Sequence, residues 1–393
     1  MIKNFYLLAL TIILSIILHA YLTNSYYQIH YGEGVSGNSI CNVGEKFNCE
    51  AVSASPYSQF LGIPLAVWGL GLNLALLILL LGHMISDDFK KQWFTAFQIL
   101  VLMSALGSIV MGIISLSFLS VYCLFCIILY GLSFFQLYLV FKISPLAEFK
   151  QNVFGLFNLS KVPYAVFITL LLFPGISIFV SAKMKRDYGG DKFEKQLDSL
   201  LSDWKNESNV IVFANTPGTL SQPAKNSETK FEIVEFADFL CGHCQKASRT
   251  IKTFLANHDA NFRFYTFPLD QTCRTTENNL TGPSCYLAKT TYCAEKQGQG
   301  WKVHDWLFDN QKDMFVSLDK IKLKVKDMIS NFGLAEAEWI SCTESEETHQ
   351  AIVNQSQFAQ NLNITGTPTI FVNGKKLKGG QVLDVLKRAY KIQ

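Results

Sequence analysis

Charged residues are scarce in this chain. Asp, Glu, Lys and Arg make up 17% of its 393 residues, and the mean hydropathy is +0.21. This composition is too apolar for an ordinary water-soluble protein of that length. The net charge of +3 is close to neutral, and no block of Lys and Arg interleaved with aromatic residues is present. We therefore expect no nucleic-acid partner.

The apolar residues are concentrated in the first half of the chain. Five runs approach or exceed the roughly 20 apolar residues that a transmembrane helix needs. They are residues 5–23, 62–82, 93–118, 121–141 and 163–182. We expect the first four runs to form an all-α membrane helix bundle within 1–145, and the fifth to add a span within 146–182. The first run is followed by no A-x-A cleavage site, so we expect a retained span rather than a cleaved signal peptide.

The Lys and Arg residues of the connections predict the orientation in the membrane. The connections at 83–92 and 142–162 carry Lys90, Lys91, Lys142, Lys150 and Lys161, whereas the loop at 24–61 holds only Lys46. The positive-inside rule then places the first two connections in the cytoplasm, although a basic cluster at 183–186 argues weakly against this. The loop at 24–61, the turn at 119–121 and the tail from 183 onward consequently lie on the extracytoplasmic side, and we assign all ten cysteines to these three places. An even number of cysteines fits an oxidising compartment.

Two cysteines stand at the start of the fourth apolar run, in the sequence VYCLFCIILYG. Cys123, Cys126 and Tyr130 follow at i, i+3 and i+7, which predicts one stripe on a helix face. At 1.5 Å of rise per residue, Cys126 lies roughly 4–5 Å deeper in the membrane than Cys123. The spacing suits a dithiol that can close on itself. The alternative is that two small residues pack a helix interface.

A second pair, Cys41 and Cys49, lies in the first extracytoplasmic loop. The segment CNVGEKFNC has few secondary-structure signals, so we expect a mobile pair that can visit two partners. A static disulfide that staples the loop is an equally open interpretation, because spacing does not reveal whether a disulfide is reducible.

These features together resemble the vitamin K epoxide reductase family. The resemblance rests on the CNVGEKFNC loop, Ser55, the GIP that enters the second span, and the CxxC followed by Tyr130, and it covers roughly 1–145. It implies a four-helix bundle that holds a quinone beside Cys126. It further implies that Cys123 is the exchange partner of Cys126, and that Cys49 and then Cys41 form the shuttle.

The resemblance also implies which residues surround the quinone. Ser55 and Tyr130 match polar residues near the family's active site. Where animal members of the family carry an amide side chain before the second span, this chain offers Ser58 and Gln59, which argues against vitamin K epoxide as its natural substrate. The aromatic candidates for the ring site are Tyr57, Phe60, Phe118 and Phe125; packing against lipid or neighbouring helices is the commoner role of such residues.

The soluble half begins, by composition, with a charged and Ser/Asn-rich linker over 183–228. The segment FEIVEFADF then alternates as a buried strand and leads into CGHCQKASRTIKTFL, a helix. Cys241 therefore lies at a helix N-terminus, which favours its thiolate, and His243 adds a second stabilising group. Cys244 completes the motif.

Residues 229–393 resemble the thioredoxin superfamily, an α/β fold. Thr367 and Pro368 precede a late strand, and the resemblance implies that this proline is cis and lies against the CxxC motif. The helical segment between the motif and Thr367 resembles the DsbA branch, which comprises bacterial thiol oxidants. That branch often carries an acid six residues before the first cysteine, here Glu235, which would relay a proton for Cys244; an ordinary strand residue is the alternative.

Four cysteines remain: Cys273, Cys285, Cys293 and Cys342. They allow three connectivities. We favour Cys273 with Cys285, which would close the loop after the FPLD strand, and Cys293 with Cys342 as a second structural bridge. A zinc site is the alternative, but one CxxC lies in the membrane and the other at a helix start, so we expect no metal.

The sequence thus predicts a quinone-linked thiol oxidase of the bacterial inner membrane, with ubiquinone or menaquinone as acceptor and secreted or periplasmic thiol proteins as clients. Electrons would pass from Cys241/Cys244 to Cys41/Cys49, then to Cys123/Cys126, and finally to quinone. Three alternatives remain: an outward-directed reductive carrier, a membrane-anchored disulfide isomerase, and a metal chaperone. The reductive carrier would need cysteines near the cytoplasmic face, where we place none.

Overall fold

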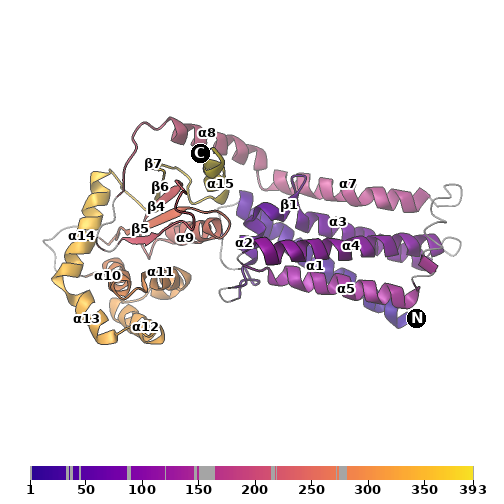
Figure 1. Ribbon diagram of the computed structural model, residues 1–393, viewed down its shortest axis with the longest axis horizontal. Coiled ribbons are helices and arrows are strands. Elements are labelled where there is room, and N and C mark those ends of the chain that lie inside the picture. Colours follow the sequence, from indigo (N-terminus) through magenta and orange to yellow (C-terminus); the bar gives the residue numbers. More distant parts are fainter. Residues whose placement is uncertain are drawn as a thin grey trace. The chain divides into compact units, whose positions relative to one another are not determined.

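The computed structural model describes residues 2–31, 35, 39–43, 46–85, 90–119, 121–145, 148–149, 164–213, 217, 219–270, 272–273 and 281–392, without the side chains of 2, 3, 164–170 and 172. The chain divides into two compact units, one containing residues 1–32 and 37–193 and the other residues 33–36 and 194–393. Figure 1 shows the elements of each unit.

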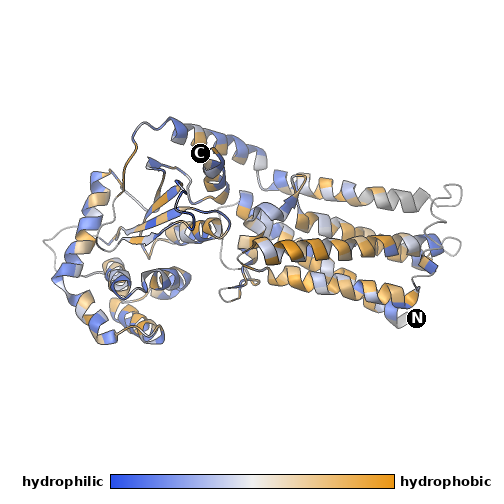
Figure 2. Ribbon diagram, in the orientation of Figure 1, coloured by the Kyte–Doolittle hydropathy of each residue, from blue (hydrophilic) through white to orange (hydrophobic). Residues whose placement is uncertain are grey.

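The first unit is helical. Its long helices are α1 (Ile2–Tyr31), α3 (Leu65–Ile85), α4 (Lys90–Phe118), α5 (Leu124–Ile143) and α7 (Tyr164–Asp187). Among the described residues, four helical segments are long and apolar enough to cross a membrane: Asn4–Tyr31, Leu65–Ile85, Lys90–Phe118 and Leu124–Ile143. Hydrophobic residues dominate α3, α4 and α5 in Figure 2. In such a run the helix satisfies every backbone hydrogen bond internally, as a bilayer requires.

The expected fifth span coincides with α7. This helix is not among the four spanning segments, and the side chains of 164–170 and 172 lie outside the described residues. The fifth span therefore stays a prediction.

Short elements connect α1 to α3. They are α2 (Cys49–Ala54), the 3-10 helix η1 (Pro56–Ser58), and the hairpin strands β1 (Gln59–Phe60) and β2 (Ile63–Pro64). The expected second span was thus placed too early, because residues 62–64 belong to this hairpin. Leu61 and Gly62 have φ angles of 53° and 75°, the left-handed conformation that such a tight turn needs.

The second unit contains a five-stranded sheet in the order β3-β5-β4-β6-β7. The strands are β3 (Leu220–Gln222), β4 (Glu232–Ala237), β5 (Asn261–Thr266), β6 (Thr369–Val372) and β7 (Lys375–Lys376). Strands β4 and β5 are parallel, and the other neighbouring pairs are antiparallel. Together with its helices this sheet makes an α/β thioredoxin fold.

Helices surround this sheet. They are α9 (Gly242–Leu255), α15 (Leu383–Ile392), and the insertion between β5 and β6 made of α10 (Pro283–Lys296), α11 (Gly300–Asp309), η2 (Gln311–Met314), α12 (Leu318–Asn331), α13 (Glu336–Glu344) and α14 (Glu346–Asn361). Side chains on β4 alternate between the two faces. Val234 and Phe236 pack in one core cluster with Ala359 of α14, and Glu235 points to the opposite face.

The expected linker at 183–228 is partly structured. It contains α8 (Gly190–Asn206) and strand β3. Leu197, Leu201 and Trp204 are buried at i, i+4 and i+7, and the indole of Trp204 donates a hydrogen bond to the carbonyl oxygen of Val372 (3.3 Å). The linker prediction was wrong here because it weighed composition above helical periodicity.

Candidate functional site

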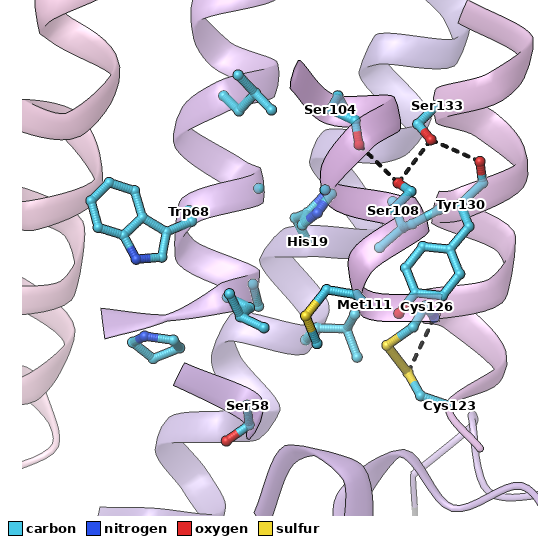
Figure 3. A pocket seen from close by; sticks show the side chains of 18 of the residues that line it. His19, Ser58, Trp68, Ser104, Ser108, Met111, Cys123, Cys126, Tyr130 and Ser133 are labelled. Atoms are coloured by element: carbon cyan, nitrogen blue, oxygen red, sulfur yellow. Dashed lines mark hydrogen bonds between the residues drawn. A yellow bond between two sulfur atoms is a disulfide. The ribbon is translucent and has the colours of Figure 1, made fainter. Parts of the chain in front are cut away.

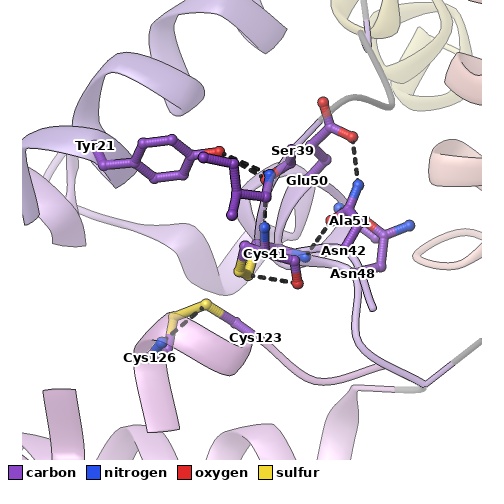
Figure 4. Close-up of a disulfide and its surroundings, with 11 residues drawn as sticks. Tyr21, Ser39, Cys41, Asn42, Asn48, Glu50, Ala51, Cys123 and Cys126 are labelled. Atoms are coloured by element: carbon purple, nitrogen blue, oxygen red, sulfur yellow. Dashed lines mark hydrogen bonds between the residues drawn. A yellow bond between two sulfur atoms is a disulfide. The ribbon is translucent and has the colours of Figure 1, made fainter. Parts of the chain in front are cut away.

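Two disulfides lie next to each other in the first unit. Cys41 is bonded to Cys49 and Cys123 to Cys126, with Cα–Cα distances of 5.8 and 5.2 Å. The sulfur atoms of Cys41, Cys49 and Cys123 all lie within 4.8 Å of one another, and all three residues are buried. Figure 4 shows the two disulfides facing each other. This is the proximity that thiol–disulfide exchange between the pairs requires.

Backbone hydrogen bonds hold the loop against the residue before Cys123. The amide of Asn48 donates to the carbonyl oxygen of Tyr122 (2.9 Å), and the amide of Tyr122 donates to the carbonyl oxygen of Lys46 (2.8 Å). Asn48 also caps α2, because its side-chain oxygen accepts from the amide of Ala51 (2.9 Å). The prediction of a segment without secondary structure was therefore wrong at Cys49, which is the first residue of a capped helix.

The second disulfide lies at the start of α5. Cys123 is the N-cap residue, and its sulfur accepts a hydrogen bond from the amide of Cys126 (3.1 Å). The helix itself begins after Cys123, and Cys123, Cys126 and Tyr130 line the same cavity, as the expected stripe implies. The N-terminal position remains favourable for a thiolate, because free amides and the helix dipole point at the sulfur.

A cavity of about 270 Å³ lies beside this disulfide within the first unit. Side chains from α1, α3, α4 and α5 line it, and Figure 3 shows ten of them labelled. Of the residues expected near a quinone, the cavity is lined by Ser55, Tyr57, Ser58, Cys126 and Tyr130.

Four other expected residues do not line the cavity. Gln59 and Phe60 belong to the exposed hairpin, where Gln59 accepts a hydrogen bond from Tyr26 (3.4 Å). Phe118 is exposed, and the ring of Phe125 packs against Tyr21. The side chains of Gln59 and Phe60 point outward because both residues belong to the exposed strand β1. This strand was not predicted from the sequence.

Several polar residues of the cavity were not predicted from the sequence. They are His19, Asn73, Ser104, Ser108, Ser133 and Gln136. The signal was present, because polar groups inside a membrane span are expensive and tend to be functional.

Three polar atoms of the lining are buried without a hydrogen-bond partner among the described residues. They are Ser55 Oγ, Asn73 Oδ1 and Gln136 Nε2. Ser55 Oγ and Gln136 Nε2 can donate to a carbonyl oxygen, and Asn73 Oδ1 can accept from a hydroxyl group. These three atoms have almost no accessible surface, so they do not open to the cavity. The size of the cavity fits the ring of a quinone.

The second unit carries a reduced cysteine pair at the start of α9. Cys241 is the N-cap residue, and its thiol donates to the carbonyl oxygen of Thr367 (3.5 Å), next to the cis Thr367–Pro368 bond. Hydrogen bonds from the Cys244 thiol, from Thr367 and from backbone amides outweigh burial and lower the pKa of Cys241 to about 6. Cys241 is consequently a thiolate at neutral pH.

The structure revises the expected role of His243. Its side chain is exposed, and its contribution to the pKa of Cys241 comes from its backbone amide. Cys244 is fully buried, and burial raises the pKa of its thiol strongly. The two cysteines thus differ in role: Cys241 is the nucleophile, whereas Cys244 must give up its proton to a base before it can react.

Glu235 occupies the central strand β4 and is fully buried. Neither of its carboxylate oxygens has a hydrogen-bond partner among the described residues. Burial, and then the charge of Cys241, raise the pKa of Glu235 to about 8. Its charge also contributes to the raised pKa of Cys244. Such coupling fits a carboxylate that exchanges a proton with Cys244.

The other four cysteines form two disulfides. Cys273 is bonded to Cys285 and Cys293 to Cys342, which is the pairing favoured above. Nδ1 of His349 lies 3.9 Å from the sulfur of Cys273. Sulfur atoms held in a disulfide offer no thiolate to a metal. Cys273, Cys285 and His349, which lie close together, could therefore ligate a metal ion only after the disulfide is reduced.

Comparison with known families places both halves of the chain. Residues 6–141 match the model of the vitamin K epoxide reductase family, and residues 232–391 match that of the DSBA-like thioredoxin domain. The chain joins a vitamin K epoxide reductase family domain to a DsbA-like thioredoxin domain. Both domains support thiol–disulfide oxidoreductase activity.

Several solved structures resemble part of the chain. BdbD from Bacillus subtilis, in its oxidised form, is 20% identical, and the match covers 47% of this chain and 98% of that one with a TM-score of 0.37. MdbA, a thiol-disulfide oxidoreductase from Corynebacterium diphtheriae, is 17% identical over 48% and 98%, with a TM-score of 0.36. A thioredoxin-like oxidoreductase from Silicibacter pomeroyi DSS-3 is 22% identical over 44% and 94%, with a TM-score of 0.34.

One curated protein is similar over a shorter stretch. The Na(+)/H(+) antiporter NhaA 1 of Mycolicibacterium vanbaalenii is 25% identical over 150 residues, which is 37% of this chain. The match spans 22% of the length of that antiporter.

Proposed function

We propose that this chain is a quinone-linked thiol oxidase that generates disulfides in extracytoplasmic proteins. The observation that carries the proposal is the placement of two disulfides in the first unit. Sulfur atoms of Cys41 and Cys49 lie within 4.8 Å of Cys123, and the partner of Cys123, Cys126, lines the cavity that fits a quinone ring. Electrons arriving at the loop pair thereby have a short covalent route to that cavity.

The route consists of exchange steps. A client dithiol reduces the oxidised Cys241–Cys244 pair and becomes a disulfide, and the resulting dithiol reduces Cys41–Cys49. Each exchange proceeds through a mixed disulfide and transfers two electrons. Because both domains belong to one chain, transfer between them is intramolecular and gains from a high effective concentration.

Within the membrane domain the next steps involve four cysteines. The Cys49 thiolate attacks the sulfur of Cys123, which breaks the Cys123–Cys126 bond and leaves Cys126 as a thiolate. Cys41 then attacks Cys49, which restores the Cys41–Cys49 disulfide and releases Cys123 as a thiol. The membrane dithiol finally returns to a disulfide as its two electrons and two protons reduce a quinone to a quinol.

Quinone supplies the oxidising power in this proposal, and the chain's residues bind it and fix its orientation. Cys126 and Tyr130 line the cavity together, because both lie on the same face of α5. We place the protein in the bacterial inner membrane with the thioredoxin domain on the periplasmic side, because the basic connections favour that orientation. Ubiquinone and menaquinone both have the required ring.

An anaerobic assay of Cys126→Ala tests the proposal. The oxidised protein is mixed with a reduced dithiol client and excess short-chain ubiquinone, whose fully substituted ring does not add thiols, and quinone absorbance and client disulfide are followed together. We expect the wild type to reduce quinone catalytically and the variant to show only stoichiometric client oxidation by its remaining disulfides. Equal quinone reduction by both proteins would contradict the proposed route, and client oxidation by the wild type without loss of quinone would exclude quinone as acceptor.

A further inference from the structure

One buried amide side chain of the helical insertion reaches the redox motif of the thioredoxin domain. Gln311 belongs to η2, and only 2% of its surface is exposed. Its Nε2 lies 2.7 Å from the carbonyl oxygen of Phe239 and 3.0 Å from that of Cys241. Carbonyl oxygens only accept hydrogen bonds, so the NH₂ group of Gln311 must face them. Its two hydrogens serve the two bonds.

These two carbonyl groups flank Leu240, in the loop that joins β4 to α9. The loop is also held by Asp238, whose carboxylate accepts hydrogen bonds from the amides of Leu240 and Leu269, both at 2.6 Å. Asp238 thus anchors an amide of the loop, and Gln311 anchors two of its carbonyl groups. A buried carbonyl group that loses its donor costs about 1–3 kcal/mol, so the bonds to Gln311 restrain the loop.

The conformation of Cys241 depends on this restraint. Cys241 is the N-cap residue of α9, and its sulfur accepts a hydrogen bond from the amide of Cys244 (3.3 Å). Its carbonyl oxygen accepts from the amides of Cys244 (3.0 Å) and Gln245 (3.1 Å). Gln311 donates to the same carbonyl oxygen from outside the helix. The partial positive charge of its NH₂ group lies close to Cys241, which favours the thiolate form.

A second amide side chain joins the same two segments in the opposite direction. Gln245 of α9 donates through Nε2 to the carbonyl oxygen of Phe308, near the end of α11. The rings of Phe239 and Phe308 pack together as well, with centroids 5.0 Å apart. Both amides therefore tie the motif to the insertion, but the Gln245 side chain bonds the insertion, whereas that of Gln311 bonds the loop before α9.

We propose that Gln311 is a positioning residue for thiol–disulfide exchange at Cys241. It holds the N-cap conformation in which the sulfur of Cys241 faces the amides of α9, and it thereby stabilises the thiolate. A stable thiolate leaves readily when the second thiol of a client breaks the mixed disulfide with Cys241, so Gln311 speeds the release of oxidised client. This inference rests on the first exchange of the proposed function and needs no quinone.

Gln311→Met tests the inference, because methionine has a similar length and no hydrogen-bond donor. In the reduced full-length protein, the rate at which iodoacetamide alkylates Cys241 is measured across pH by peptide mass spectrometry. We expect the variant to lower the acid dissociation constant of Cys241 by about fivefold, the size of one ordinary hydrogen bond. Because the thiolate stabilises the reduced pair, the equilibrium of Cys241/Cys244 with glutathione should shift toward the disulfide by a similar factor.

Gln245→Met is the matched control. It removes a hydrogen bond between the same two segments but leaves the carbonyl groups of the loop with their donor, so Cys241 should titrate as in the wild type. Equal shifts in Gln245→Met and Gln311→Met would show that loosening of the insertion is the cause, and they would overturn the assignment. If Gln311→Met does not fold, Gln311→Asn decides. It keeps an amide on a shorter side chain and should shift the titration in the same direction; an unchanged titration would also overturn the assignment.

The outcomes separate this inference from the proposed function. If the wild type exchanges with a dithiol client while folded Gln311→Met keeps the titration of Cys241 and the glutathione equilibrium, then Gln311 is not a positioning residue and the proposed function stands. If the wild-type Cys241–Cys244 disulfide does not exchange with the client, the proposed function fails at its first step. A wild type that exchanges but reduces no quinone, together with the expected shifts in Gln311→Met, supports this inference and removes the quinone step.

Discussion

Replacing Cys41 with alanine is expected to trap a disulfide between Cys49 and Cys123. Cys49 can still attack Cys123, because their sulfur atoms lie within 4.8 Å of each other. The thiol that resolves the mixed disulfide is then missing, so the intermediate accumulates and Cys126 stays free. Turnover should fall by about 1,000-fold or more, since removal of a covalent participant costs that much or more in other enzymes. Peptide mapping by mass spectrometry under client turnover would detect the crosslink.

The reciprocal variant is the control for this prediction. Cys49→Ala removes the attacking thiol, and we expect no crosslink to Cys123 in that protein. A crosslink between Cys41 and Cys123 in Cys49→Ala, with none in Cys41→Ala, would reverse the order of the two loop cysteines. Absence of any crosslink to Cys123 in both variants would contradict exchange between the two pairs.

Glu235→Gln is expected to remove a large pH dependence from the stability of the reduced thioredoxin domain. The pKa of Glu235 is raised from 4.5 to about 8 in the folded protein. Because the pKa of Glu235 is higher in the folded than in the unfolded state, the native state is most stable at pH values below the unfolded-state pKa. It loses stability as the pH rises through the folded-state pKa. The difference between the two pKa values corresponds to about 5 kcal/mol of unfolding free energy, at 1.36 kcal/mol for each pH unit. This loss occurs between about pH 4.5 and pH 8.

Hydrogen exchange of the β4 and α9 amides in the intact reduced protein would measure this effect. After correction for the intrinsic exchange rate, protection in the wild type should fall between about pH 4.5 and pH 6, where Cys241 is still a thiol, and it should change little there in Glu235→Gln. Glu232→Gln on the same strand is the matched control, because Glu232 is only half-buried and pairs with Arg263 at 3.1 Å. A wild-type protein with pH-independent protection would show that Glu235 is not buried as a titrating acid.

The motifs that contain the redox cysteines could be recognised in the sequence because each lies within one short continuous segment. Cys241 and Cys244 at a helix start follow from one strand-to-helix transition, and the DsbA-like domain follows from that and from the late Thr367–Pro368 pair. The first four of the five apolar runs predicted the four spanning helices, since about 20 apolar residues suffice for each.

The cavity could not be predicted, because it depends on contacts between distant segments. His19 and Gly69 belong to different helices and become neighbours only when α1 packs against α3. The backbone hydrogen bond from Asn48 to Tyr122 likewise joins two loops, and it holds one disulfide against the other. By contrast, the periodic burial of Leu197, Leu201 and Trp204 was readable in advance.

The central claim is that electrons pass through three cysteine pairs, one after the other, to quinone. Counting the thiols that quinone oxidises tests this claim most directly. The full-length protein is reduced mildly so that the Cys273–Cys285 and Cys293–Cys342 disulfides stay intact. After anaerobic removal of the reductant, a short-chain ubiquinone, whose fully substituted ring does not add thiols, is added in steps, and quinol formed and thiols lost are counted. Each quinone accepts two electrons, so the relay predicts that three quinones consume the six thiols of Cys41, Cys49, Cys123, Cys126, Cys241 and Cys244. Oxidation that stops after one quinone, or no quinol at all, would contradict it.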